Sequence, residues 1–273
     1  MPYDYRNELK AVKEYYDGDP RQKKFNALIC GHIGCGKTYA LNTARKPVHI
    51  DSFDHGGTKC LRPWIEKGEI IVDSEFEDED PFNPSAWAAW KKKTELRFQI
   101  GYFNQFGTYS IDSATKWMDA AMNAQLASAN RVAQAPLRNH DYMPVKVDME
   151  NYLSKLMRLP CDFILNGHFR EDIELLSIDK KTGIEHKKIS YRFLTIGRAS
   201  ITIPLMFDEI YVIETKETSS GYSRKFVTEA QGEYIARSRL KSNGKLDIRE
   251  PADYKALLKK IGLDWEDKPA LDI

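Results

Sequence analysis

Short apolar runs alternate with longer amphipathic stretches over the first 168 residues of the chain. Such runs are typical of parallel strands, because a strand covered by helices on both faces is apolar along its whole length. Strands are predicted at 25–30, 47–51, 69–73, 107–113 and 161–168. Helices are predicted between them, at 39–45, 84–105, 114–130 and 147–158. This alternation predicts an α/β fold with a mostly parallel central sheet flanked by helices.

The pattern changes after residue 168, where short strands follow one another. Two of them, 173–178 and 188–195, flank the turn residues 179–183 and predict a β-hairpin. Further strands are predicted at 201–204, 209–215, 225–229 and 234–238, and a closing helix at 252–261. We expect these strands to extend the sheet as a C-terminal β-hairpin extension.

The two ends of the chain are polar and divide it into three parts. We predict an N-terminal arm at 1–24, a core at 25–250 and a C-terminal helix and tail at 251–273. The arm has apolar side chains at helical spacing, namely Tyr5, Leu9, Val12 and Tyr16. It could pack on its own domain or on a neighbouring subunit. The helix at 84–105 is expected to place its own stripe in the core: Trp87, Trp90, Leu96, Ile100 and Phe103.

Composition excludes some classes of protein. The chain has 273 residues, 42% of them hydrophobic, and a formal net charge of +1. That balance gives no general attraction to nucleic acid or membrane, so any DNA contact must come from local patches. No apolar run reaches the length of a membrane span, and we expect no membrane association. The four cysteines lack metal-site spacing, which indicates reduced thiols in a cytoplasmic protein.

One stretch matches a specific motif. Residues 31–38 fit G-x-x-x-x-G-K-[ST] between a predicted strand and a predicted helix. Glycine lets the backbone approach phosphates, and consecutive N–H groups form a cradle for negative charge. Lys37 can reach the β- and γ-phosphates, and the Thr38 hydroxyl can ligate Mg²⁺. The nucleotide-binding residues predicted here are Gly31, His32, Ile33, Gly34, Cys35, Gly36, Lys37, Thr38 and Tyr39. Cys35 is better explained as a small loop residue than as a redox group.

Carboxylates at strand ends are the candidates for holding metal and activating water. Hydrolysis of a nucleotide needs Mg²⁺ opposite the phosphate loop, usually held by a carboxylate that ends an adjacent buried strand, and Asp112 fits. Asp54 is the first choice for the group that activates water, and Asp51 is the second. For each of these two, a turn-capping role stays open. The acidic run 75–80 is interpreted as a solvated loop rather than a metal site.

Polar residues on later strands are further candidates. Asn166 and His168 end an apolar strand and could sense the γ-phosphate, with a structural turn as the alternative. Arg237 and Arg239 alternate along one predicted strand, so both should point to the same face. Two guanidiniums there suit an arginine finger that acts across a subunit boundary, and an ordinary solvated face is the competing interpretation.

With these motifs in this order, the chain resembles phage-encoded RecA-like AAA-type ATPases, nucleotide-binding proteins encoded near single-strand annealing and recombination genes. The resemblance spans residues 25–240. Besides the phosphate loop it rests on the segments 50–58, 166–168, 207–211 and 234–240, together with Asp112.

The resemblance implies a RecA-like core that binds ATP with Mg²⁺ and assembles as a homo-oligomer, in rings or filaments, on single-stranded DNA. It implies that Asp54 activates water, although relatives often carry Glu there. It also implies that Arg237 or Arg239 reaches the γ-phosphate of a neighbour. DNA-binding loops would correspond to 131–147 and 169–198.

A basic strip gives the DNA role partial support. Its members are Lys180, Lys181, Lys187, Lys188, Arg192 and Arg198, with Tyr191 and Phe193 available to stack on bases. Acidic residues are interspersed, and a charged hairpin is usually just solvated.

The leading hypothesis is a Mg²⁺-dependent ATP hydrolase that binds ATP and ADP and acts on single-stranded DNA in phage recombination, annealing or replication. A nucleotide-gated assembly ATPase without a DNA role is the first alternative. A small-molecule kinase is the second, and the β-rich C-terminal half argues weakly against it.

Overall fold

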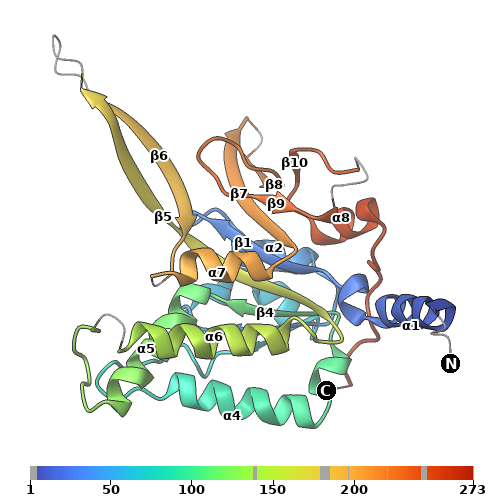
Figure 1. Ribbon diagram of the computed structural model, residues 1–273, viewed down its shortest axis with the longest axis horizontal. Helices are drawn as coiled ribbons and strands as arrows, with labels where there is room; N and C mark the ends of the chain where they lie inside the picture. The colour runs from blue at the N-terminus through green and yellow to red at the C-terminus, as the bar shows by residue number, and fades with distance from the viewer. Residues whose placement is uncertain are drawn as a thin grey trace.

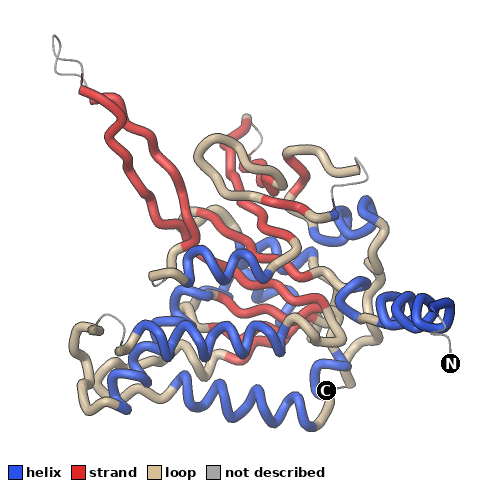
Figure 2. The backbone as a smooth tube through the Cα atoms, viewed as in Figure 1, coloured by secondary structure: helices blue, strands red, loops and turns tan. Residues whose placement is uncertain are grey.

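The computed structural model describes residues 5–137, 140–178, 185–195, 197–219, 221–240 and 245–272. Its centre is a twisted sheet with helices on both faces (Figures 1 and 2). The strand order is β10-β8-β7-β1-β5-β4-β2-β3, with β6 paired to β5 and β9 paired to β7. The six strands from β7 to β3 pair in parallel, and the remaining four pair antiparallel. The predicted α/β fold with a mostly parallel central sheet is confirmed.

The parallel strands are buried where they pair with one another, as their apolar sequences predict. They are β1 (Asn26–Gly31), β2 (Val48–Ser52), β3 (Ile70–Asp73), β4 (Thr108–Asp112), β5 (Asp162–Ile178) and β7 (Glu209–Thr218). The antiparallel strands are β6 (Glu185–Phe193), β8 (Gly221–Val227), β9 (Arg237–Ser238) and β10 (Arg249–Pro251).

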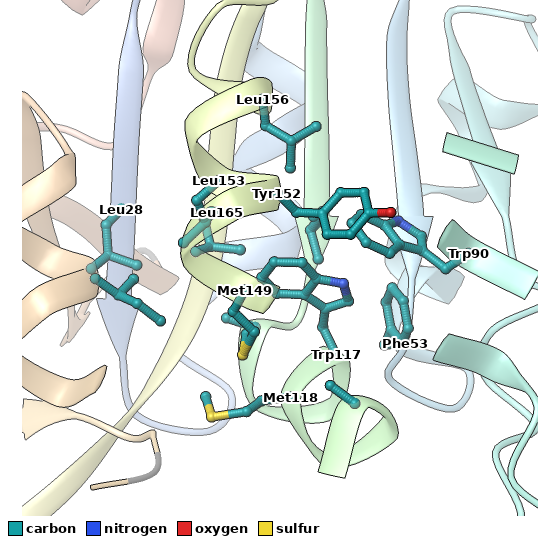
Figure 3. Close-up of a cluster of buried hydrophobic side chains, with 14 of the residues drawn as sticks. Leu28, Phe53, Trp90, Trp117, Met118, Met149, Tyr152, Leu153, Leu156 and Leu165 are labelled. Carbon is teal, nitrogen blue, oxygen red and sulfur yellow. The ribbon is translucent and has the colours of Figure 1, made fainter. Parts of the chain in front are cut away.

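Two apolar layers cover the sheet. On one face lie α4 (Ala86–Gln99), α5 (Ala114–Ser128), α6 (Tyr142–Leu156) and α7 (Ala199–Met206). Their aromatic and methionine side chains pack on β1, β4 and β5, and Trp90, Trp117 and Tyr152 form the centre of this layer (Figure 3). The other face is covered by α2 (Lys37–Ala40), α3 (Arg62–Ile65) and α8 (Tyr254–Ile261). Helix α8 therefore belongs to the core packing, with Tyr254, Leu257 and Leu258 buried.

The remaining helix, α1 (Tyr5–Gly18), has no buried residue and extends away from the sheet (Figure 1). Its stripe Tyr5, Leu9, Val12 and Tyr16 is about 60% exposed throughout. The helix exists as predicted, and the described part of its own chain leaves its apolar stripe largely exposed.

Several predicted boundaries are wrong. The segment 201–204 is predicted as a strand, but it lies in helix α7, where Ala199 and Ile203 face the core four residues apart. Packing of one helical face thus outweighs local propensity. The strand predicted at 234–238 is only Arg237–Ser238, and the helix predicted at 39–45 ends at Ala40 and continues as a 3₁₀ turn at Leu41–Thr43.

Other differences concern the length of elements. Strand β5 runs without interruption from the predicted strand 161–168 into the predicted hairpin, and it projects with β6 from the body (Figure 1). The hairpin is confirmed, while its turn 179–183 lies outside the described residues. Helix α6 begins at Tyr142 and shortens the predicted loop 131–147. In the helix predicted at 84–105, Trp87, Trp90 and Phe103 are buried, but Leu96 and Ile100 are exposed.

Candidate functional site

Most of the candidate residues meet at the edge of the sheet where β1, β2 and β4 end. Gly31 of β1 lies opposite His168 of β5, and Asn166 of β5 lies opposite Asp112 of β4. Asp112 in turn lies opposite Ser52, the last residue of β2. The carboxyl ends of parallel strands are where open α/β sheets collect ligands. The registers therefore bring the phosphate loop, Asp112 and Asn166 to one edge.

The phosphate loop 31–38 makes tight turns and packs closely on itself and on the sheet. Gly34 and Gly36 adopt φ values of 78° and 95°, which residues with a side chain rarely adopt. A Cβ at Gly31 would lie 2.5 Å from the Cys35 Sγ, which is buried beside it. Burial raises the pKa of the Cys35 thiol, which suits a packing role rather than a reactive one. The Thr215 hydroxyl on β7 donates to the Cys35 carbonyl at 2.8 Å and ties the loop to the sheet.

Lys37 is buried at the base of this loop. Its ammonium group donates to the carbonyls of Gly31 and His32, both at 3.0 Å. The side chain thus points back across the loop rather than into solvent. A cation held under a ring of backbone groups suits a phosphate chain, whose charge it neutralises.

Thr38 and Asp112 are in direct contact. The Thr38 hydroxyl donates to the Asp112 Oδ2 at 2.5 Å. Burial raises the pKa of the Asp112 carboxyl to about 6, and the Thr38 hydrogen bond opposes that rise. Strand β5 lies between β1 and β4, so the expectation that the carboxylate ends a strand adjacent to that of the loop is wrong. Thr38, in the first turn of α2, nevertheless contacts Asp112 of β4.

Asn166 occupies the gap between the loop and Asp112. It is fully buried, and neither atom of its amide has a hydrogen-bond partner. Its side chain interacts with the Asp112 carboxylate and lowers the pKa of that group. A buried amide normally has partners, so an unpaired one at this edge indicates a polar ligand nearby.

Asp54 lies in the turn after β2 and is half-buried. Its Oδ1 accepts a hydrogen bond from the Ser113 hydroxyl at 2.9 Å, next to Asp112. Its charge contributes to the raised pKa of Asp112, so the two carboxylates face the same space. Glu77 fixes the turn, because its carboxylate accepts from the Ser52 hydroxyl at 2.6 Å and the Gly56 N–H at 2.8 Å.

Asp51 has no free acceptor to offer a water molecule. Trp90 Nε1 and Arg97 Nη1 each donate to it at 2.8 Å, Tyr109 donates at 2.5 Å, and His49 Nε2 lies at 2.9 Å. Burial alone would raise the pKa of Asp51, but His49, Arg97 and Tyr109 hold it at about 2. The second choice for the activator is therefore a buried structural ion pair.

Residues 23–240 match the protein family described as AAA domain (AAA_24). The chain belongs to the AAA-domain family. It is a P-loop NTPase, and the G-x-x-x-x-G-K-[ST] stretch 31–38 lies inside the matched region. No curated protein gives a significant match.

Solved structures give more distant likenesses. The KaiC-like protein PH0186 from Pyrococcus horikoshii OT3 is 13% identical, with a TM-score of 0.38, over 78% of this chain and 81% of that one. An ATPase from the type III secretion system of pathogenic bacteria is 13% identical, with a TM-score of 0.44, over 70% of this chain and 52% of that one. The description of the fold therefore rests on the strand order above.

The donors of the AAA domain fit magnesium better than a protein-only metal site. The described residues contain no group of three or more His, Cys, Asp or Glu side chains that could hold a metal ion. Mg²⁺ is commonly bound by one or two protein oxygens, with phosphates and waters completing the shell. Thr38 Oγ1 and Asp112 Oδ2 supply such a pair beside the phosphate loop.

The two candidate arginine-finger residues, Arg237 and Arg239, lie away from this edge. Arg237 pairs with Ile210 near the start of β7, and β7 starts level with Ala27 of β1. Arg237 donates to the carbonyls of Pro204 and Phe207 at the end of α7, at 3.3 and 2.5 Å, and Arg239 pairs with Asp208 at 2.5 Å. Arg239 follows β9, so the expectation that both arginines lie on one strand is wrong. Neither lies at the phosphate loop of its own AAA domain.

The base of the β5–β6 hairpin packs on the phosphate loop. The His32 ring lies 4.9 Å from that of Tyr191, which stacks on Tyr234 at 5.4 Å. His168 is half-buried beside the Thr115 hydroxyl at 3.4 Å. Burial and the nearby Lys37 lower the pKa of His168, so this imidazole is neutral at pH 7.

The basic strip is less available than its sequence suggests. Arg192 pairs with Asp172, and Lys187 pairs with Glu185. Phe193 is buried against Gly167, so it does not present a free ring to a base. Lys180 and Lys181 lie outside the described residues.

Three residues of the site were missed in the sequence. Ser113 and Glu77 position Asp54, and Arg224 of β8 packs on Gly36. The acidic run 75–80 is not simply solvated, because Glu79 also accepts from the first N–H groups of α4. A serine directly after Asp112 was a readable signal, whereas Glu77 and Arg224 arrive from elements that no local motif marks.

Proposed function

We propose that this AAA domain is a Mg²⁺-dependent ATP hydrolase. The observation that carries the proposal is the 2.5 Å contact between Thr38 and Asp112, formed at the edge where the phosphate loop lies. A bare anion site would have no need of a buried carboxylate beside the Thr38 hydroxyl. Thr38 and Asp112 would hold the metal, which neutralises charge on the β- and γ-phosphates.

The chain's own residues have separate roles in this proposal. Lys37 and the loop N–H groups bind the phosphates. Asp54, held by Ser113 and by the turn that Glu77 anchors, orients and deprotonates the attacking water. Asn166 offers its unpaired amide to the γ-phosphate or to that water, and His168 lies at the same edge. Arg239 is the arginine we retain as the finger for a neighbouring copy, because its side chain is exposed.

The first test separates binding from turnover. Lys37→Ala should abolish both nucleotide binding and phosphate release, since it removes a cation from the phosphate cradle. Lys92→Ala, on an exposed turn of α4, is the matched control and should leave both unchanged. Turnover by folded Lys37→Ala protein at the wild-type rate would exclude this site as the hydrolytic one.

A second variant tests the role of Asp54. Asp54→Asn should retain ATP binding and lower turnover by roughly a hundredfold or more, as expected for loss of a general base. Calorimetry measures the binding and phosphate release measures the turnover. Equal losses in both would assign Asp54 to binding instead.

Single-stranded DNA is the partner that we propose for this ATPase, in the recombination or annealing setting that its resemblance implies. In the described residues the hairpin projects from the body, and two of its basic side chains, Lys187 and Arg192, pair with acids. DNA contacts would therefore depend on salt. Binding of a labelled oligonucleotide at low salt, with ATP present and absent, tests this partner, and no binding under either condition would remove it.

The exposed stripe of α1 favours a second candidate, an assembly ATPase gated by nucleotide without DNA. Chromatography with ATP and without DNA distinguishes the two. A stable oligomer formed by ATP alone would favour assembly, and phosphate release stimulated by DNA would favour the DNA role.

A further inference from the structure

Arg224 of strand β8 lies directly on the phosphate loop. A Cβ at Gly36 would collide with its Nε and come within 2.7 Å of its Cδ. The Arg224 Cζ lies 5.2 Å from the centre of the ring of Tyr39, the residue that follows the loop. The guanidinium is therefore held between the backbone of Gly36 and an aromatic face.

The charge of Arg224 has no carboxylate partner in the described part of the chain. Its Nε is buried without a hydrogen bond. By contrast, Arg249 on the neighbouring β10 pairs with Glu214, and Arg97 pairs with Asp51 and Asp73. A guanidinium has five N–H donors, and burial removes some of the water that would otherwise accept from them. An anion bound beside Arg224 would accept from these donors and neutralise its charge.

The arrangement of the sheet indicates which anion. Strand β8 lies two strands from β1 on one side, and β4 with Asp112 lies two strands away on the other. Arg224 and Asp112 thus border the phosphate loop from opposite sides. The contact between Thr215 and Cys35 fixes the β7–β8 pair against the loop, which holds Arg224 in this place.

We propose that Arg224 is a nucleotide-binding residue whose guanidinium binds the phosphate chain in its own subunit, on the side of the loop away from the metal pair. This inference rests on the proposed function. It adds a second cation to Lys37, supplied from the β7–β8 hairpin.

Stacking on the nucleobase is the other chemistry that a guanidinium beside Tyr39 offers. Tyr39 is 41% exposed and meets Trp64 at 5.8 Å, so an aromatic surface is close. The unpaired charge favours phosphate, because stacking alone would leave the N–H donors unsatisfied. Inorganic pyrophosphate separates the two, since it carries the charge and has no base.

The experiment measures pyrophosphate and ADP affinity by calorimetry on the full chain. Arg224→Gln should weaken both ligands by roughly ten- to a hundredfold, the range for losing a charge-assisted hydrogen bond. Arg224→Lys should fall between, because it keeps the charge and loses the planar fork. Lys225→Gln removes the same charge one residue along β8, where the side chain points to the other face, and should change neither affinity.

Three outcomes decide the matter. Loss of both affinities in Arg224→Gln, with thermal unfolding without ligand unchanged, supports the phosphate role. Loss of ADP binding with pyrophosphate binding intact would assign the residue to the base and overturn it, and wild-type affinities would overturn it outright. Since Arg224→Lys keeps the packed side-chain stem, its affinities test the role even if Arg224→Gln unfolds. Failure of wild-type protein to bind either ligand would instead refute the proposed function.

Discussion

Asp51 and Asp112 lie near the ends of neighbouring strands, yet their surroundings give their charges opposite energetic consequences. Asp51 is buried among four hydrogen-bonding side chains, which hold its pKa at about 2. Asp112 is equally buried with a single hydrogen bond, from Thr38, and its pKa rises to about 6. The first carboxylate therefore stabilises the fold, whereas the charge of the second costs stability, which is consistent with its proposed role in binding a cation.

Replacement of Asp112 should exchange activity for stability. Its folded pKa lies above its ordinary value of 3.8, so the folded state binds the extra proton between about pH 4 and 6. Stability contributed by this group falls as pH rises through that window and stays lower above it. Asp112→Asn should thus raise the free energy of unfolding at pH 7.5 by on the order of 1–3 kcal/mol, while abolishing Mg²⁺-dependent turnover.

Urea unfolding of both proteins at pH 4 and pH 7.5 checks this prediction. The stability gain should shrink at pH 4, where wild-type Asp112 is protonated as well. A destabilised variant at pH 7.5, or an equal gain at both pH values, would contradict a buried charge at this position.

Replacement of Asp51 should have the opposite effect. Asp51→Ala leaves Arg97 and the Trp90 and Tyr109 donors without their acceptor, which we expect to cost about 3–5 kcal/mol. Wild-type stability from Asp51 is present above pH 4 and is lost as pH falls towards 2, since its folded pKa is depressed. Denaturant unfolding measures the loss, and turnover by the remaining folded protein should persist. A stable variant without turnover would restore Asp51 as the activator.

Among individual residues, the sequence predicts those that belong to a local motif. The loop, Lys37 and Thr38 have a fixed spacing, and Asp112 follows an apolar run. Asp51 and Asp54 could not be separated, because the partners of Asp51 come from α4 and β4, some forty to sixty residues away in the chain. Arg224 has no motif at all.

Strand β5 shows how an element can exceed its sequence pattern. Its first half is apolar because helices cover it, and its second half is mostly polar and exposed because it leaves the sheet and pairs only with β6. A change of pattern therefore marks a change of environment within one strand rather than a break. The same logic explains α7, where two isoleucines suggest a strand but only one of them, Ile203, is buried.

The turn after β2 depends on a carboxylate from the next connection. Glu77→Gln keeps the size of the side chain but weakens its bonds to the Ser52 hydroxyl and the Gly56 N–H. We expect kcat to fall about tenfold with KM nearly unchanged, because Asp54 loses its fixed position while the phosphate loop does not. Steady-state phosphate release gives both constants.

Glu75→Gln is the control for this variant, since Glu75 pairs with Lys93 away from the turn. It should leave both constants unchanged. A rise in KM without a fall in kcat for Glu77→Gln would place the turn in nucleotide binding instead.

Across the whole molecule, the sheet supports both the site and the elements that pack against it, such as the β7–β8 pair. The mostly parallel order could be predicted from alternating elements, because buried parallel strands have a recognisable composition. The order of strands could not, since pairing between distant segments leaves no local signal. None of the helices in the described ranges is long and apolar enough to cross a membrane.

Helix α1 needs a partner that its own core does not supply. An isolated helix of 14 residues is marginal in water, and α1 buries no residue. Its exposed apolar stripe would be covered in a homo-oligomer of this chain.

Leu9→Glu places a charge in that stripe and should shift light-scattering mass from oligomer towards monomer in the presence of ATP. Glu14→Gln, on the opposite side of α1, should leave the mass unchanged, because it alters only an exposed pair with Lys10. An unaltered mass for Leu9→Glu, in protein that still binds ATP, would mean that α1 is not the contact between copies.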